Sequence, residues 1–352
     1  MIGIVGGGLA AAKVIEGYRD AGGTDRITIW SRDPHGPYHR PPLSKRLLRG
    51  ESEPDEALVH PKEWYAEQDV DLRAGEELAS LDEVRADKVV IATGARPRPL
   101  GEALLLRTLD DSLELRRRAQ GARTAIVIGG GFIGCEVTAS LTQLGVQVTQ
   151  VVREPNVFWT LQAPPLSEAL HETYRAHGVD LQLEATEIPT DADLVVAGIG
   201  VQPNVELAEA AGLEVRNGVV VNERFETSKP GVYAVGDVAE FFDPVFGRHR
   251  RIEHWSNAAY HGTTLGKILA GEAERYDIVS AFFSEEFGRS FRSFGDAEGH
   301  DSTELDGDFH GERAVFRQLR GGNLVGAVAI GLDPAEEDEL KEEIRAGAAL
   351  LH

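Results

Sequence analysis

The sequence predicts an α/β protein built on two βαβ units, and three observations support this fold class. A short apolar strand, a glycine cluster and an amphipathic helix follow one another at the N-terminus, and the same order recurs near residue 125. A third apolar strand, residues 232–235, runs directly into Gly236 and Asp237. That position is typical of the strand edge at which open α/β sheets bind ligands.

The first unit places a glycine fingerprint between a strand at residues 2–5 and a helix at residues 9–19, and a second strand at residues 27–30 closes it. Gly6, Gly8 and Ala11 fit G-x-G-x-x-G/A. The first glycine permits a tight turn, the second lets a pyrophosphate approach the backbone, and the small third residue lets the helix pack on the strand. Glycines that serve only a turn are the plain alternative.

The second unit contains the complete fingerprint, with Gly129, Gly131 and Gly134 after a strand at residues 125–128. We expect its helix at residues 132–144, ended by Gly145, and the next strand at residues 146–152. Two such units predict two Rossmann-like dinucleotide-binding domains. They fit either a duplicated binding protein or an enzyme that brings two nucleotides together.

Composition narrows the class of protein. With 352 residues, of which 42% are hydrophobic, the chain is long enough for two or three domains. The formal net charge of -22 argues against nucleic-acid binding. Neither a signal peptide nor a membrane-length apolar run is visible, so we expect a cytoplasmic protein. The chain has a single cysteine, Cys135, which excludes a dithiol relay and a cysteine-rich metal site. We expect no bound metal. We interpret Cys135 as a small buried residue. No sequence patch indicates an oligomeric state.

Further motifs carry a resemblance to a known family. The chain is similar to the FAD-dependent pyridine nucleotide oxidoreductases, most closely to the ferredoxin reductases of bacterial oxygenase systems and the apoptosis-inducing-factor flavoproteins. The resemblance covers essentially the whole chain, including the tail FGRSFRSFGDAEG. It is carried by the first glycine loop, PYHRPPLSK at 37–45, ATGARPR at 92–98, GGGFIGCE at 129–136, GIGVQPN at 198–204 and TSKPGVYAVGDVA at 227–239.

The resemblance implies a domain plan and an activity. It places a discontinuous FAD domain at residues 1–103 and 223–275, an NAD(P) domain at 104–222, and a small C-terminal α+β domain of reductase type at 276–352. It implies a ferredoxin–NAD(P)+ reductase type of enzyme that passes electrons from NADH or NADPH through FAD to a ferredoxin-type iron–sulfur protein. A flavin-dependent NAD(P)H oxidase or quinone reductase and a redox-sensing flavoprotein remain alternatives.

The resemblance also implies the site residues. Lys45 is expected near flavin N5, paired with Glu136 on the nicotinamide side. Without the resemblance, we would interpret Lys45 as a surface lysine and Glu136 as an ordinary helix carboxylate. Leu78 and Trp255 are read equally well as core residues. The implied FAD contacts are Gly6, Gly8, Ala10, Ala11, Asp33, Arg40, Lys45, Leu78, Thr93, Gly94, Arg107, Gly236, Asp237 and Trp255, and the implied NAD(P) contacts are Gly129, Gly131, Ile133, Gly134, Glu136, Arg153 and Gly200.

Three places need a separate interpretation. The acidic residue that holds the FAD ribose in the family falls on Arg32, and we favour the adjacent Asp33 for that role. The corresponding acidic residue of the second unit is replaced by Val152, followed by Arg153, which favours the 2′-phosphate of NADPH, unless Glu154 serves NADH in a shifted register. Basic residues that could dock an acidic ferredoxin, or simply form a sheet's outer face, are Arg289, Arg292, Arg313, Arg317 and Arg320.

Overall fold

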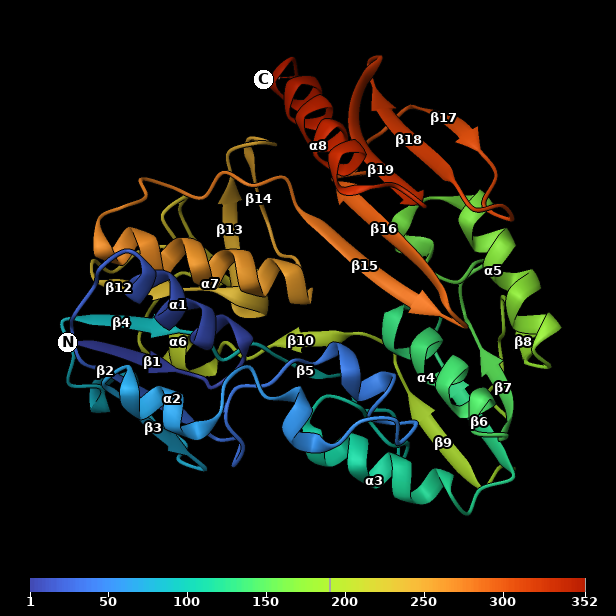
Figure 1. The fold of residues 1–352 in the computed structure, drawn as a ribbon, viewed down its shortest axis with the longest axis horizontal. Coiled ribbons are helices and arrows are strands. Elements are labelled where there is room, and N and C mark those ends of the chain that lie inside the picture. Colours follow the sequence, from blue (N-terminus) through green and yellow to red (C-terminus); the bar gives the residue numbers. More distant parts are fainter. Residues whose placement is uncertain (190, 352) are drawn as a thin grey trace. The chain divides into compact units, whose positions relative to one another are not determined.

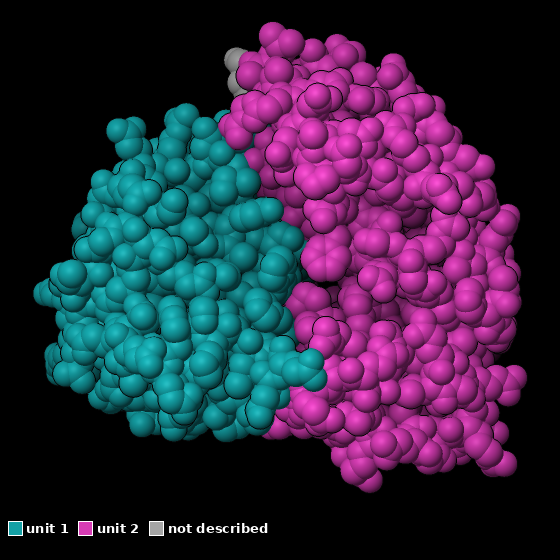
Figure 2. Space-filling model, viewed as in Figure 1, with its two compact units in different colours: residues 1–39, 55–96, 202–278 teal, residues 40–54, 97–201, 279–352 magenta. Residues whose placement is uncertain are grey.

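The computed structural model describes residues 1–189 and 191–351, and within it the chain forms two compact units. Unit 1 comprises Met1–His39, Asp55–Arg96 and Gln202–Ile278, drawn in teal in Figure 2. Unit 2 comprises Arg40–Pro54, Pro97–Val201 and the chain from Val279 onward, drawn in magenta. The division into three domains stays a prediction.

Unit 1 is organised around a parallel sheet with the strand order β12-β4-β1-β2-β3. All residues of β1 and β2 are buried, as expected for strands covered on both faces. A second sheet has the order β11-β13-β14. The strands are β1 (Ile2–Val5), β2 (Ile27–Ser31), β3 (Val70–Ala74), β4 (Lys88–Ile91), β11 (Val219–Val221), β12 (Val232–Ala234), β13 (Ala239–Asp243) and β14 (Arg248–Arg250).

The helices of unit 1 include two that pack very closely, α1 (Leu9–Asp20) and α7 (Trp255–Ala270), seen together in Figure 1. A Cβ atom on Gly266 would lie 2.4 Å from the carbonyl oxygen of Val14, so this contact requires glycine. Helix α7 also approaches the fingerprint itself, since a Cβ atom on Gly262 would lie 2.4 Å from the carbonyl oxygen of Ala10. The remaining helical segments are α2 (Lys62–Glu67), α6 (Glu206–Ala210) and short 3-10 turns at Leu81–Glu83 and Gly236–Val238.

Unit 2 contains a second parallel sheet, with the order β8-β7-β6-β9. Gly145 has a φ of +86° and follows the last turn of α4, as predicted for a glycine that ends a helix. The elements are β6 (Thr124–Ile128), β7 (Gln147–Val151), β8 (Asp180–Gln182), β9 (Leu194–Ala197), α3 (Leu109–Ala119), α4 (Phe132–Gln143) and α5 (Pro164–Ala176), with 3-10 turns at Pro41–Ser44 and Trp159–Leu161.

The C-terminal part of unit 2 is an antiparallel sheet, β15-β16-β19-β18-β17, accompanied by the last helix, α8 (Figure 1). Its side chains join the core of the preceding part, since Phe291 contacts Phe158 edge-on with ring centroids 5.0 Å apart. The elements are β15 (Ala281–Glu286), β16 (Arg289–Gly295), β17 (Ser302–Gly307), β18 (Ala314–Arg320), β19 (Asn323–Ile330) and α8 (Pro334–Ala349).

Two short strands, β5 (Ala95–Pro97) and β10 (Val201–Pro203), pair where the chain passes between the units, and one 3-10 turn, Pro54–Ala57, lies at another crossing. The predicted fold class is confirmed: both βαβ units are present, and their strands and helices begin and end within one or two residues of the expected positions. Among the residues that the structure describes, no helix is long and apolar enough to span a membrane.

Candidate functional site

The first glycine loop lies at the carboxyl end of β1. Gly6 has a φ of +112°, and a Cβ atom there would lie 2.2 Å from the carbonyl oxygen of Ala92, so neither its conformation nor its surroundings admit another residue. Gly8 is the N-cap of α1, and Ala10 and Ala11 are buried in the first turn. The loop therefore brings the N-terminal end of α1 to the strand edge, as the fingerprint predicts.

The second loop repeats this geometry in unit 2. Gly129 has a φ of +119°, and its Cβ would lie 2.3 Å from the carbonyl oxygen of Gly198. Gly134 must also be small, because its Cβ would lie 2.3 Å from the carbonyl oxygen of Gly129. Ile133 follows Gly131, the N-cap of α4, within the first helical turn.

Gly131 differs from its neighbours, because a Cβ atom there would meet no protein atom within 4 Å. The backbone φ of -87° at this position is ordinary. Steric contacts within the described protein therefore do not require glycine, whereas the approach of a pyrophosphate to the backbone does. Neither α1 nor α4 has an acidic residue in its first turn, so both helix N-termini suit an anion. The residues present fit two dinucleotides.

The first glycine loop, the ATGARPR motif and Gly236–Asp237 meet at the carboxyl edge of the unit 1 sheet. Strands β12, β4 and β1 are neighbours, so the segments that follow them lie side by side. Thr93 donates its hydroxyl proton to the carbonyl oxygen of Asn204, and the Asn204 amide donates to the carbonyl oxygen of Thr93, both at 2.8 Å. The backbone N–H of Asn204 donates to the carbonyl oxygen of Gly94. These bonds join the ATGARPR and GIGVQPN motifs.

Gly236 and Asp237 follow β12 at this edge. Gly236 has a φ of +75°, and its N–H donates to Nδ1 of His261, 3.3 Å away. Burial lowers the pKa of His261 to about 3, so the ring stays neutral and able to accept this bond. His261 thus supports the turn that presents Asp237, a supporting residue that no sequence motif indicated.

Asp33, the predicted ribose contact of the first site, accepts two hydrogen bonds. One of its carboxylate oxygens accepts from the N–H of His35 at 3.0 Å, and the other accepts from the Tyr38 hydroxyl at 2.7 Å. Arg32 is exposed and lies 3.4 Å from Glu77. Leu78 packs against the apolar cluster of Val5, Trp30 and Val84, in agreement with a core role. The proposed ribose contact of Asp33 remains a prediction.

Two predicted FAD contacts, Arg40 and Arg107, touch each other in unit 2. Nε of Arg40 donates to the carbonyl oxygen of Arg107 at 3.3 Å. The N–H of Arg107 donates to Asp111, which forms a capping box with Thr108, the N-cap of α3. The RPPLSK segment and the start of α3 are therefore held together.

Trp255, the first residue of α7, makes a specific polar contact. Its indole N–H donates to Nδ1 of His39 at 3.0 Å. This bond requires a proton on Nε2 and none on Nδ1 of the imidazole. Burial lowers the pKa of His39 and favours that neutral form. Trp255 is half-buried, so its ring is neither a plain core side chain nor a free surface group.

The two predicted catalytic residues are in contact. Nζ of Lys45 lies 2.5 Å from Oε1 of Glu136, and the two side chains are 15% and 8% exposed. Ser44 donates its hydroxyl proton to the other oxygen of Glu136, and Ser284 donates to Oε1 at 2.7 Å. Ser284 also lies 2.5 Å from Oε1 of the fully buried Glu286. Sequence reasoning indicated neither Ser284 nor Glu286.

Cys135, beside Glu136 on α4, is fully buried. Its thiol donates to the carbonyl oxygen of Gly130 at 3.5 Å. Burial raises the pKa of Cys135, so the reactive thiolate is disfavoured. The interpretation of Cys135 as a small buried residue is confirmed.

Val152 and Arg153 follow the carboxyl end of β7, where the ribose end of the second site is predicted. Val152 is buried against Gly130, whose Cβ would lie 2.5 Å from the valine side chain, while Arg153 is exposed. The N–H of Ala185 donates to the carbonyl oxygen of Val152 and fixes the backbone there. Gly200, exposed with a φ of +95°, accepts a hydrogen bond from the N–H of Arg98. The proposed contact of Arg153 with a 2′-phosphate remains a prediction.

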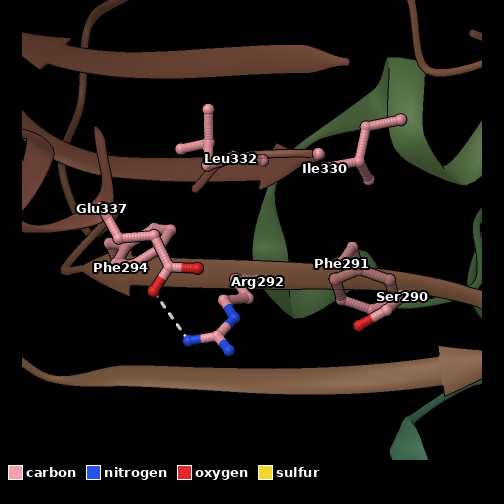
Figure 3. A pocket seen from close by; sticks show the side chains of 9 residues that line it. Ser290, Phe291, Arg292, Phe294, Ile330, Leu332 and Glu337 are labelled. Atoms are coloured by element: carbon pink, nitrogen blue, oxygen red, sulfur yellow. Dashed lines mark hydrogen bonds and ion pairs between the residues drawn. The ribbon is translucent and has the colours of Figure 1, made fainter. Parts of the chain in front are cut away.

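The arginines considered for docking are largely paired with acidic residues. Arg292 lies 2.7 Å from Glu337, Arg317 lies 2.6 Å from Glu343, and Arg313 lies 3.1 Å from Asp306 and from Glu336. Figure 3 shows the Arg292–Glu337 pair at a pocket between β16, the end of β19 and α8. No predicted cofactor residue is among those that line this pocket. Carboxylates of α8 and β17 therefore partly balance the charges of Arg292, Arg313 and Arg317, and a docking role for these arginines remains a prediction.

Comparisons with known proteins agree with this geometry. The family described as pyridine nucleotide-disulphide oxidoreductase matches residues 2–262. The chain is 34% identical to a putidaredoxin reductase of Pseudomonas putida over 85% of this chain and 81% of the relative. It is 31% identical to the ferredoxin–NAD(+) reductase component of an anthranilate 1,2-dioxygenase system of Burkholderia cepacia, over 94% and 90% of the two chains. A solved covalent putidaredoxin reductase–putidaredoxin complex is similar with a TM-score of 0.91 and 32% identity, over 98% of this chain and 93% of that one.

Proposed function

The chain belongs to the pyridine nucleotide-disulphide oxidoreductase family, and we propose that it is an FAD-dependent reductase that passes electrons from NADH to a ferredoxin-type iron–sulfur protein. The relatives named above are reductases of putidaredoxin and ferredoxin, which supports the acceptor class. The name of the second supports NADH as the donor. Use of NADPH through Arg153 is part of the same proposal.

Helix α4 carries both a loop suited to a pyrophosphate at its N-terminus and one member of a buried ion pair, and this arrangement supports the proposal. Gly131 leaves open space at the N-terminus of α4, and Glu136, one turn further along the same helix, holds Lys45. A dinucleotide whose pyrophosphate lies at Gly131 is thus oriented by the helix that carries the Lys45–Glu136 pair. A dithiol mechanism is ruled out because the chain has one cysteine, which is buried.

When bound, FAD accepts hydride from the nicotinamide and releases single electrons to the acceptor. Gly6, Gly8 and the N-terminus of α1 would hold its pyrophosphate, and Asp237 its ribityl chain. Arg40 and Arg107 would supply positive charge to its phosphates. Lys45, held by Glu136, would place a cation at the flavin ring, where negative charge develops. The protein's contribution is therefore positioning and electrostatics.

The experiment that tests the function measures electron delivery to a purified [2Fe–2S] ferredoxin. The protein should be isolated yellow, contain extractable FAD, and reduce ferredoxin with NADH under anaerobic conditions. NADH-dependent oxygen consumption that proceeds at the same rate without ferredoxin would instead assign an oxidase. A colourless protein that cannot be reconstituted with FAD would reject the proposal. We place the activity in the cytoplasm, where NADH is supplied.

A further inference from the structure

Ser284 lies between two buried glutamates. Its Oγ atom is 2.7 Å from Oε1 of Glu136 and 2.5 Å from Oε1 of Glu286. A serine hydroxyl has one proton to donate, and an ionised carboxylate has none. Ser284 therefore cannot donate to both glutamates, and one of these two contacts requires a proton on a carboxyl group.

The partners of each carboxyl show which one carries the proton. Glu136 receives the Lys45 ammonium group and two serine hydroxyls, a set of donors that matches an ionised carboxylate. Glu286 is fully buried, and among the described residues its Oε2 atom has no hydrogen-bond partner. A buried charge left in that state would be strongly unfavourable, whereas a neutral acid leaves only a carbonyl oxygen unpaired.

The groups that face Glu286 reinforce this assignment. Burial, and after it the charge of Glu136, raises the pKa of Glu286 to about 8. The hydrogen bond from Ser284 and the charge of Lys45 act in the opposite direction and lower this pKa. From α4 and α5, Cys135 and Tyr174 face it as neutral groups, since burial raises the pKa of both. On its own strand Glu285 is exposed, and Arg289, opposite on β16, directs its guanidinium to the carbonyl oxygen of Phe309.

We propose that Glu286 is a positioning residue that stores one proton for the Lys45–Glu136 pair and passes it through Ser284. In the transfer, the Glu286 proton moves to Oγ of Ser284 while the serine proton moves to Oε1 of Glu136. Glu286 becomes a carboxylate, Glu136 becomes a neutral acid, and Ser284 is again a hydroxyl. No other reactant is needed.

The transfer changes the charge beside Lys45. With the proton on Glu286, the charges of Lys45 and Glu136 cancel; with the proton on Glu136, Lys45 loses its nearest negative partner. Lys45 can then neutralise negative charge that arises elsewhere at the site. This use of the transfer rests on the proposed function, in which Lys45 lies at the flavin. The presence of the stored proton on Glu286 does not depend on that function.

The stored proton is tested by infrared spectroscopy of the flavin-containing protein as purified. Protonated carboxyl groups have a carbonyl stretching band that ionised carboxylates lack. We expect this band below the raised pKa of Glu286, and we expect it to disappear with a midpoint near pH 8. Glu286→Gln, which keeps the size and stays neutral, should lose the band, and the exposed control Glu285→Gln should keep it. Identical spectra for Glu286→Gln and the unmodified protein would overturn the proposal.

Two further measurements test the stored proton and its transfer separately. If Glu286→Gln does not fold, the titration of the unmodified protein decides, and the lack of any carboxyl band that titrates near pH 8 overturns the proposal. Transfer is tested by reducing the flavin with dithionite instead of NADH, so failure of NADH oxidation has no bearing on the result. Reduction should change the carboxyl band in the unmodified protein and leave it unchanged in Ser284→Ala. The same change in both proteins would show that Ser284 does not carry the proton.

Discussion

Nζ of Lys45 lies 2.5 Å from Oε1 of Glu136, and this ion pair joins the end of the RPPLSK segment to helix α4. Both side chains are largely buried, and the adjacent Ser44 adds a hydrogen bond to the same carboxylate and receives another at its carbonyl oxygen from Ser140. The segment is therefore held at several points along one face of α4. Electrostatics and local rigidity come from the same contacts.

Removal of the lysine charge should destabilise the protein strongly. Lys45→Met leaves Glu136 buried without its cation, and breaking a buried pair from one side costs about 3–5 kcal/mol. Urea unfolding measures the loss. Lys341→Met is the control, because the ion pair of Lys341 with the exposed Asp338 is worth less than about 1 kcal/mol. Equal losses in the two variants would show that the Lys45–Glu136 pair does not act as a buried pair.

Stability should depend on pH through Glu286. The unfolded chain loses this proton near 4.5 and the folded protein near 8, so the folded state binds more protons between these values. Stability from this group is complete below the lower value and falls as pH rises, by at most about 1.4 kcal/mol per pH unit. Glu286→Gln should remove that slope, and unfolding curves across this range measure it. Glu285→Gln should retain the slope, and a slope unchanged in Glu286→Gln would contradict the assignment.

Gly131→Ala should separate binding from folding. Its methyl group meets no protein atom within 4 Å, so the protein should still fold, with only the small loss of stability that alanine causes at a helix N-cap. The approach of the pyrophosphate is blocked, so KM for NADH should rise at least about tenfold, equivalent to about 1.4 kcal/mol. Steady-state kinetics measure KM. Gly134→Ala is the contrasting variant, since its methyl group would lie 2.3 Å from a carbonyl oxygen and should reduce stability itself. An unchanged KM in Gly131→Ala would place the pyrophosphate elsewhere.

Arg153→Ala should affect NADPH selectively. If the exposed guanidinium receives a 2′-phosphate, its loss should lower kcat/KM for NADPH by a factor equivalent to about 1–3 kcal/mol. The value of kcat/KM for NADH should stay unchanged. Ratios of kcat/KM for the two donors provide the measurement. A loss of the same size with both donors, or with neither, would remove Arg153 from donor recognition.

Local patterns in the sequence were sufficient for the two βαβ units. The strand at Ile2–Val5, the glycine loop and the helix at Leu9–Asp20 follow from apolar spacing and the special conformation of Gly6. The Lys45–Glu136 contact was expected only through the family resemblance, because no local pattern links a lysine in a loop to a glutamate on a distant helix.

Other parts of the site depend on tertiary contacts that no short pattern contains. Ser284 and Glu286 lie on a strand whose alternation resembles that of any half-buried strand, and their role appears only when β15 lies against α4. The ion pairs of the candidate docking arginines were not predicted for the same reason, since the carboxylates that pair with Arg292 and Arg317 come from α8. Charge at a surface depends on neighbours that are distant in the sequence.

The most direct measurement is anaerobic stopped-flow mixing of the purified protein with NADH, followed at the flavin absorbance band. We predict rapid bleaching with a rate that saturates with NADH, a weaker apparent affinity in Gly131→Ala, and return of the oxidised spectrum on addition of oxidised ferredoxin. A flavin that NADH does not bleach, although dithionite does, would contradict the claim that the two glycine loops serve one path of hydride from NADH to FAD.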